Sequence, residues 1–198
     1  ALAVTVTDAS VAAAALNTLD GKTTVAVAVN STTVTGDVAD VKIAYAAQGS
    51  TISGLGNEAV TLSDSSIAAT DITSVNTSTS GTVTVQATTV TGAAGDLVTA
   101  YAAQGSGVDG LGNEAVTVNS GTASVAQVNT LASATSGTLT ATVTEGDMAT
   151  LAGITESGNA LAVTVTDASV AAAALNTLDG KTTVAVAVNS TTVTGDVA

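Results

Sequence analysis

The chain has 198 residues and contains no Cys, His, Pro, Phe or Trp, and its only aromatic residues are two Tyr. Without Cys and His it has no disulfide framework, no thiol site, no zinc site built on those ligands and no histidine-based catalysis. Sixteen acidic residues against three basic ones give a net charge of −13, so the phosphates of nucleic acids and anionic lipids would be repelled. These counts favour a non-enzymatic protein that binds no nucleic acid.

The chain is built from repeats, and the repeats determine its organisation. Residues 160–198 reproduce residues 1–39 without a difference, so the period is 159 residues. We therefore expect residues 1–159 to be one full period of a longer tandem array and residues 160–198 to begin the next. "AYAAQGS" and "GLGNEAVT" each occur twice, 56 residues apart. Such strings divide the period into sub-repeats at about residues 5–60, 61–116 and 117–163.

Seven short segments alternate apolar and polar residues, which is the pattern of a strand with one buried face. Their apolar pairs are Val4/Val6, Val27/Val29, Val60/Leu62, Val83/Val85, Val116/Val118, Ala141/Val143 and Val163/Val165. Five positions after each of the first six strands stands another residue of apolar type. This fixed distance predicts a stacked column of Val11, Val34, Ile67, Val90, Ala123 and Met148.

Ala-rich stretches with helical spacing follow the strands. In "DASVAAAALNTLDG" we expect Asp8 to be the N-cap of a helix that Gly21 ends. "GDVADVKIAYAAQG" places Val38, Val41 and Tyr45 on one helical face. Tyr45 and its copy Tyr101 are expected to be half-buried, with their hydroxyl groups pointing outward.

Strands of one kind that each return through a helix must lie parallel, and such connections are almost always right-handed. The sequence therefore predicts an α/β repeat fold. The expected architecture is a right-handed β/α solenoid with a parallel sheet on one side, short Ala-rich helices on the other and about six coils per 159-residue period. At about 4.8 Å per strand, one period would advance by roughly 29 Å. The purely apolar runs are short, so no membrane span is predicted in this segment.

"GLGNEAVT" lies in the two coils with the longest strand spacing, 33 residues from Val29 to Leu62 and from Val85 to Val118. We expect it to be a glycine turn that closes an insertion, with a solvated Glu. "GSGVDG" at residues 105–110 matches a dinucleotide-binding pattern, but it precedes a strand instead of following one. No cofactor is therefore predicted here.

Calcium is the one metal that the sequence leaves open. Asp109, Asn113 and Glu114 resemble an oxygen-rich Ca²⁺ loop, although the spacing is not that of an EF-hand. In the other copy Ser53 stands in place of the Asp, which leaves only Asn57 and Glu58. The three residues are retained as a weak Ca²⁺ site, against the alternative of a plain surface turn.

Three strings resemble the repeats of giant Thr/Val/Ala-rich cell-surface proteins of marine cyanobacteria. They are "TVTDASVAAAALNTLDGKTTVAV", "GLGNEAVTLSD" and "TVTEGDMATLAGITESGNALAVTVTD". The group includes the surface protein that marine Synechococcus needs to swim without flagella, and the likeness covers essentially the whole chain. It implies export, a place on or beyond the outer membrane, and a role in motility, attachment or surface coating. It supplies no catalytic residues to carry over.

The leading hypothesis is thus a structural repeat segment of an exported giant cell-surface protein or extracellular filament. Its partners would be neighbouring repeats and laterally packed identical chains. The alternative is an adhesin that binds a glycan or a surface through the exposed strand face or the long-coil loops. Ice binding is a third hypothesis, through one rank formed by Thr5, Thr61, Thr84, Thr117, Thr142 and Thr164.

Overall fold

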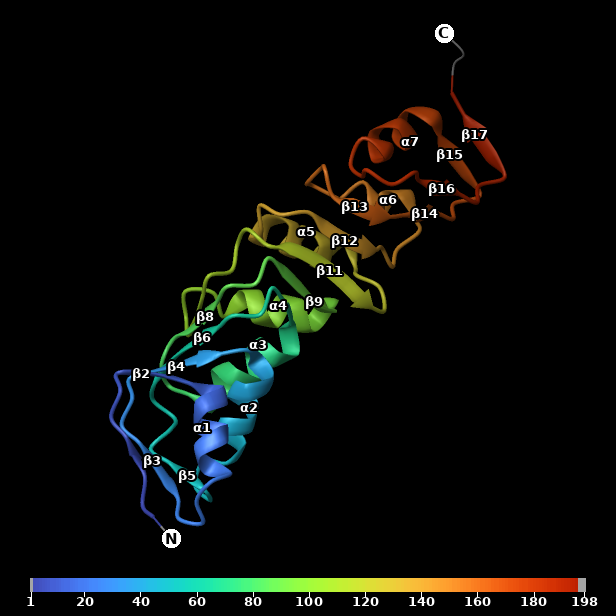
Figure 1. Cartoon of the computed structure of the whole chain (residues 1–198). Coiled ribbons are helices and arrows are strands. Elements are labelled where there is room, and N and C mark those ends of the chain that lie inside the picture. Colours follow the sequence, from blue (N-terminus) through green and yellow to red (C-terminus); the bar gives the residue numbers. More distant parts are fainter. Residues whose placement is uncertain (1, 196–198) are drawn as a thin grey trace. The chain divides into compact units, whose positions relative to one another are not determined.

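The computed structural model describes residues 2–195. Helices and short strands alternate along the chain, with about 30% of the residues in helices and 31% in strands (Figure 1). All the strand pairs in the described residues whose register is defined are parallel. The prediction of repeated β-α units with parallel sheets is therefore confirmed. Within residues 2–195 the sheets are neither closed nor curled, so the solenoid itself stays a prediction.

The chain forms two compact bodies, and each is described by itself. The first comprises the residues up to Thr88 together with Ala102–Leu111. Its elements are β1 (Thr5–Val6), β2 (Ser10–Ala12), α1 (Ala13–Asp20), β3 (Val27–Val29), β4 (Thr33–Gly36), α2 (Val38–Ala46), β5 (Ile52–Ser53), β6 (Ala59–Leu62), β7 (Ser66–Ala68), α3 (Ala69–Ser78), β8 (Val83–Val85) and β10 (Val108–Asp109).

Two parallel ladders organise the first body. One has the order β1-β3-β5, and the other has the order β10-β8-β6-β4-β2. In the second ladder Val11, Val34, Val60, Val83 and Val108 are successive register partners, so one apolar column runs through five strands. Helices α1 and α2 contact each other and strand β4, which places the Ala-rich helices against this column.

The second body comprises Thr89–Tyr101 and the described residues from Gly112 onward. Its elements are β9 (Thr89–Ala93), α4 (Ala94–Ala102), β11 (Ala115–Ser120), α5 (Val125–Ala134), β12 (Leu139–Thr142), α6 (Met148–Leu151), β13 (Ala160–Ala162), β14 (Thr164–Val165), β15 (Ser169–Ala171), α7 (Ala172–Asp179), β16 (Ala187–Val188) and β17 (Thr192–Thr194). Here β13, β12, β11 and β9 lie side by side in that order, while β14 pairs with β16 and β15 with β17.

The long coils contain strands that the sequence pattern missed. Ile52, in the first supposed insertion, begins β5 and is the register partner of Val27. Val108, in the second, begins β10 and is the partner of Val83. Both side chains are fully buried. The stretch before each "GLGNEA" is therefore a paired strand followed by a turn, not an unpaired insertion.

This extra strand changes the register that the sequence predicted. Val11 pairs with Val34 as expected, but Val34 then pairs with Val60 instead of Ile67. In the second body Val90 pairs with Val116, Ala123 bridges to Val143, and Met148 is the first residue of α6. The predicted single column is therefore wrong between Val34 and Ile67 and again after Val90. Because the long coil contributes the additional strand β5, β6 takes the place beside β4 that the sequence assigned to the segment containing Ile67.

The predicted helix boundaries were half correct. Gly21 is the C-cap residue of α1, as expected. Asp8 is not its N-cap, because the intervening residues Ser10–Ala12 form β2 and α1 begins only at Ala13. Helix α2 has the side-chain cap that the sequence suggested for α1: the Asp37 carboxylate accepts a hydrogen bond from the Asp40 N–H at 2.9 Å. No described helix is long and apolar enough to cross a membrane.

Candidate functional site: contacts between successive β-α units

Each "GLGNEAVT" string carries a glutamate that is almost completely buried. Glu58 is 1% exposed, and its Oε2 accepts hydrogen bonds from the Tyr45 hydroxyl and the Gly56 N–H, both at 2.8 Å. We call Tyr45 with Glu58, and their copies Tyr101 with Glu114, the Tyr–Glu pairs. The first pair joins the last turn of α2 to the residue just before β6. It therefore closes the long loop on itself.

The second Tyr–Glu pair repeats this geometry with one more hydrogen bond. Glu114 Oε2 accepts from the Tyr101 hydroxyl at 2.8 Å and from the Gly112 N–H at 2.9 Å. Its Oε1 also accepts from the Asn113 N–H, at 3.3 Å. Oε1 of Glu58, in contrast, is buried and has no hydrogen-bond partner among the described residues. The second pair is thus the better satisfied of the two, and a buried acceptor without a donor costs stability.

These contacts overturn two expectations from the sequence. The glutamate of the octapeptide is not solvated, and the tyrosine hydroxyls point inward to it. Burial, together with the hydrogen bond to the glutamate, raises the pKa of both Tyr45 and Tyr101 well above its ordinary value. The tyrosines are therefore neutral donors at any physiological pH. Their role is to satisfy a carboxylate that folding removes from water.

The following β-α unit also binds the backbone of each buried glutamate. The Thr79 hydroxyl donates to the Glu58 carbonyl oxygen at 2.7 Å, and the Thr135 hydroxyl donates to that of Glu114 at the same distance. Glycine is required two residues later, because a Cβ at Gly81 would lie 2.2 Å from the Glu58 carbonyl oxygen. The long loop is thus held from inside by Tyr and from the next unit by Thr.

Carboxylates form a second kind of contact between units, which the sequence analysis did not foresee. Asp64 Oδ2 accepts a hydrogen bond from the Val38 N–H, the first N–H of helix α2, at 2.8 Å. Glu145 does the same for Val125 of α5, and Asp167 for Met148 of α6, at 3.0 and 2.7 Å. Each carboxylate follows a strand and caps the helix of the preceding unit. The free N–H groups and positive end of a helix favour such an acceptor.

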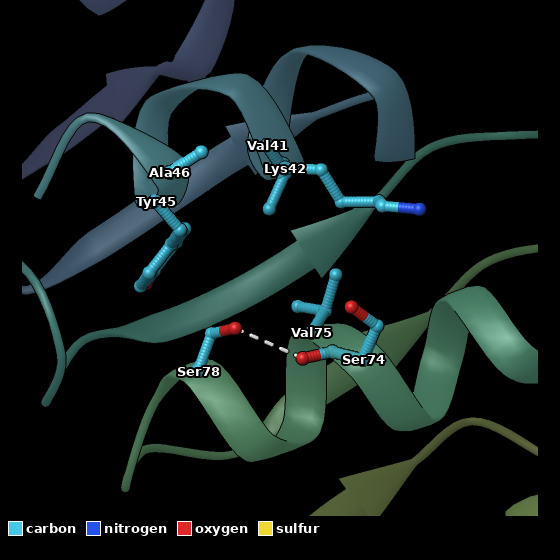
Figure 2. Close-up of a pocket in the computed structure, with 7 residues that line it drawn as sticks. All are labelled: Val41, Lys42, Tyr45, Ala46, Ser74, Val75 and Ser78. Carbon is cyan, nitrogen blue, oxygen red and sulfur yellow. Dashed lines mark hydrogen bonds between the residues drawn. The ribbon is translucent and has the colours of Figure 1, made fainter.

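A small hollow lies between helices α2 and α3, beside Tyr45. Its volume is about 270 Å³, and Figure 2 shows Tyr45 and Val75 extending into the space between the helices. Lys42 on its rim pairs with Asp71 at 2.7 Å, and the Ser78 hydroxyl donates to the Ser74 carbonyl oxygen. No base accepts the serine proton, and the chain has no His. The hollow therefore gives no basis for a catalytic proposal.

The three residues of the predicted Ca²⁺ loop have different surroundings. Asp109 is exposed on β10 in the first body, and Asn113 is exposed in the second. Glu114 is buried, and both its oxygens already accept hydrogen bonds from the chain. Across residues 2–195 no group of three Asp, Glu, His or Cys residues is placed to hold a metal ion. Calcium binding at Asp109, Asn113 and Glu114 stays a prediction.

The threonines pair differently from the single rank that ice binding would need. Thr61 stands between Thr35 and Thr84, and the next partner of Thr84 is Asp109. Thr5 pairs with Ala28 instead. In the second body Thr91, Thr117 and Thr140 form a separate row. The described rows are three residues long, so the predicted rank of six is not formed.

Comparison with known proteins adds no family to this description: no protein-family model, curated protein or solved structure matches the chain.

Proposed function

We propose that this chain is a structural, non-enzymatic repeat segment of an exported giant cell-surface protein or extracellular filament, and that its β-α units continue as a right-handed solenoid. The observation that carries the proposal is the contact set between successive units. Register-matched valines, cross-unit carboxylate caps and the threonine hydroxyl that binds the Glu58 carbonyl oxygen all join one unit to the next in sequence, and the Tyr–Glu pairs hold the long loops between them. Contacts of this nearest-neighbour type are how repeat proteins obtain stability.

The exact repetition of the 159-residue period favours a mechanical role for the chain over a ligand-binding role. Helix α7 has the same eight residues as α1, and the six helices α1–α6 make up the interval between the two copies. A tandem array of such periods would add the same length each time, roughly 29 Å for six strand spacings. Length, stiffness and identical repeated faces suit motility, attachment or coating at a cell surface. The resemblance to marine cyanobacterial surface proteins is the basis for proposing that location.

Small-angle X-ray scattering on chains of one, two and four periods tests the mechanical part. A rod predicts a maximum dimension that rises linearly with the number of periods at a constant cross-section. A maximum dimension that rises as the cube root of chain length would reject it. Immunolabelling of intact and permeabilised cells of the source organism tests location. Labelling that appears only after permeabilisation would reject a cell-surface location.

An adhesin remains the second candidate, because one specific feature favours it. A shallow hollow of about 400 Å³ in the first body is lined by Val29, Asn30, Ser31, Thr32, Gly54, Asn57 and Glu58. Asn30, Thr32 and Asn57 are exposed there, and this size and polarity could accept a sugar ring. The second sub-repeat has Gln86 and Ala87 in place of Asn30 and Ser31, so the site would not recur identically.

A glycan array with the intact chain, followed by Asn57→Ala, tests the adhesin. Binding that this substitution abolishes would favour the adhesin. Asn113→Ala, at the same octapeptide position in the other copy, is the matched control. Absence of binding to every glycan on the array would contradict the adhesin hypothesis.

A further inference from the structure

The connection between β3 and β4 contains the acceptor motif for N-linked sugars. Residues 30–32 are Asn-Ser-Thr and match the pattern N-x-[ST]. The motif recurs at residues 189–191, so a tandem array would carry it at the same place in every 159-residue period. It also occurs at residues 76–78, Asn-Thr-Ser, inside helix α3. So short a motif arises by chance in a chain rich in Ser and Thr, and its surroundings decide which occurrence is a site.

Residues 30–32 present the acceptor and the hydroxyl on one outward face. Val29 and Ser31 are buried. Asn30 and Thr32, which alternate with them, are exposed. Such alternation is that of an extended backbone, in which side chains two residues apart point to the same side. The Thr32 hydroxyl is held on this side, because it donates to the Ala9 carbonyl oxygen at 3.0 Å. Both groups of the motif are therefore open to an enzyme at once.

The motif in α3 has a different geometry. Side chains two residues apart in a helix are separated by about 200° around the axis, so Asn76 and Ser78 lie on different faces. The Ser78 hydroxyl donates to the Ser74 carbonyl oxygen at 2.9 Å. Asn76 is half-buried, and Gly107 lies against its amide, since a Cβ at Gly107 would be 2.8 Å from the Asn76 Oδ1. Modification of Asn76 would therefore require local opening of the helix.

The polar hollow of about 400 Å³ in the first body lies beside the exposed motif. Asn30 itself lines it, together with Thr32 and Asn57, which are both exposed. A sugar ring linked to the Asn30 amide would lie at this hollow, where Thr32 and Asn57 offer hydrogen-bonding groups. The second sub-repeat has Gln86 and Ala87 in place of Asn30 and Ser31, so it has no acceptor at the corresponding position.

We infer that Asn30 is the acceptor of an N-linked sugar, which a transferase takes from a glycosyl diphosphate. The amide nitrogen attacks C1 of the sugar and forms the C1–N bond, while the bond from C1 to the diphosphate oxygen breaks. The diphosphate leaves with the bonding electrons, and one amide proton passes to a base of the transferase. Such a sugar is bulky and solubilising, so it would keep this face of the chain in water. The inference goes beyond the proposed structural role and does not depend on it.

Mass spectrometry of the protein isolated from its source organism tests the inference. Trypsin cleaves after Lys22 and Lys42, so residues 23–42 form one peptide that contains the exposed motif. We expect this peptide to carry the mass of at least one hexose or N-acetylhexosamine, and fragmentation should place that mass on Asn30. Cleavage after Asp71 and Asp96 gives residues 72–96, which contain the motif of α3 and should be unmodified.

The folded chain with a transferase specific for N-x-[ST] provides the matched comparison. With a nucleoside-diphosphate glucose as the sugar donor, Asn30 should be modified about 10-fold faster than Asn76 or more, because only Asn76 depends on local opening. Asn30→Gln and Thr32→Ala should each abolish modification of residues 23–42, and Thr32→Ser should retain it. Synthetic peptides of residues 23–42 and 72–96, which have no tertiary structure, should be modified at similar rates.

Any of three results would overturn the acceptor role of Asn30. The first is an unmodified peptide 23–42 in the native protein, and the second is a sugar on its Ser or Thr residues instead. The third is equal modification of Asn30 and Asn76 in the folded chain, since exposure would then not select the acceptor. An unmodified Asn30 together with glycan binding that Asn57→Ala abolishes would assign the hollow to a foreign sugar. None of these results bears on the scattering test of the rod.

Discussion

Two regions of this chain share one sequence and differ only in their neighbours. In the first copy Leu2 is 78% exposed and Val34 is fully buried, whereas in the second copy Leu161 is fully buried and Val193 is 54% exposed. Helices α1 and α7 cover the same eight residues, and β1 and β2 recur as β14 and β15. The strands that follow differ: β3 and β4 have three and four residues, whereas β16 and β17 have two and three. Local sequence thus determines the helix and the first two strands, while burial comes from the adjoining unit. This division is what a nearest-neighbour repeat protein requires.

The largest expected contrast is between Val34→Asp and Val193→Asp. The first substitution places a carboxylate in a closed apolar column and should cost more than about 4 kcal/mol of unfolding free energy. The second places it on an open edge and should cost less than about 1 kcal/mol. Urea denaturation followed by circular dichroism measures both. Similar losses in the two variants would mean that the copies are equally buried.

The opposite order is expected at the other end of the repeat. Leu161→Ala removes a fully buried side chain and should cost about 2–5 kcal/mol, and Leu2→Ala should cost less than about 0.5 kcal/mol. The sensitive copy is now the second one. In the Val34/Val193 pair the first-copy substitution should cost more, and in the Leu2/Leu161 pair the second-copy substitution should cost more. If the second copy were simply the less stable one, the first-copy substitution would cost more in both pairs. The same denaturation experiment measures these losses.

Tyr45→Phe tests whether the Tyr–Glu pair holds the long loop, in which the carbonyl oxygen just before β5 accepts the Val27 N–H at 2.8 Å. The variant removes one of the two donors to Glu58 Oε2 and should cost about 1.5–3 kcal/mol. Hydrogen exchange should accelerate at Val27 and stay unchanged at Val186, its counterpart in the second copy. Tyr101→Phe is the matched control: it removes the same bond from Glu114 and should leave Val27 as it is. Acceleration of both amides by Tyr45→Phe would point to general loosening instead.

Alkaline pH should release the same segment without a mutation. The folded-state pKa of Tyr45 and Tyr101 is raised by burial and by the glutamate, so above pH 10 the unfolded chain loses protons that the folded chain keeps. The stabilisation is fully present below pH 10 and decreases as the pH rises beyond it. Thermal melts from pH 8 to 11 should show this decrease, and the Tyr45→Phe/Tyr101→Phe double variant should show a smaller one. An equal decrease in both proteins would assign the effect to other groups.

The smallest expected contrast concerns the carboxylate caps. Asp167 accepts from the Met148 N–H, whereas the identical Asp8 has no helix before it in the described chain. Asp167→Ala should cost about 1 kcal/mol, as loss of a helix cap does, and Asp8→Ala less than about 0.5 kcal/mol. Differential scanning calorimetry can resolve the two. Equal losses of stability in the two variants would show that the contribution of Asp167 to stability does not depend on the helix of the preceding unit.

The sequence was sufficient for the repeated local pattern and insufficient for its lateral register. Period-two alternation identified β3, β6 and β8, and helical spacing identified α1 and α2. Strands β5 and β10 show no alternation, because the residues two positions before and after Ile52 and Val108 are Ser and Gly. Because both were missed, Val34 was aligned with Ile67 instead of Val60.

The buried glutamates were missed for a different reason. A Glu beside Gly and Asn has the composition of a solvated turn, and its burial depends on a tyrosine 13 residues earlier. One signal could have revealed the pair: Tyr and Glu recur together at this spacing in two sub-repeats, and the third, with "GNA", lacks both. The cross-unit caps could not be read from one unit, because donor and acceptor lie 19 to 26 residues apart in different units.

The most direct test of this account is the register of successive strands, measured with disulfides in a chain that has no Cys of its own. Thr35 and Thr61 are register partners on neighbouring parallel strands, and such pairs lie within the Cα distance that a disulfide spans. Oxidation of the Thr35→Cys/Thr61→Cys variant should therefore yield an intramolecular disulfide in the folded protein. Thr35→Cys/Ala68→Cys, the pair expected if Val34 lay beside Ile67, should not form one. Formation of the second disulfide would contradict the strand register described here, and formation of neither would contradict the stacked parallel units on which the proposed function depends.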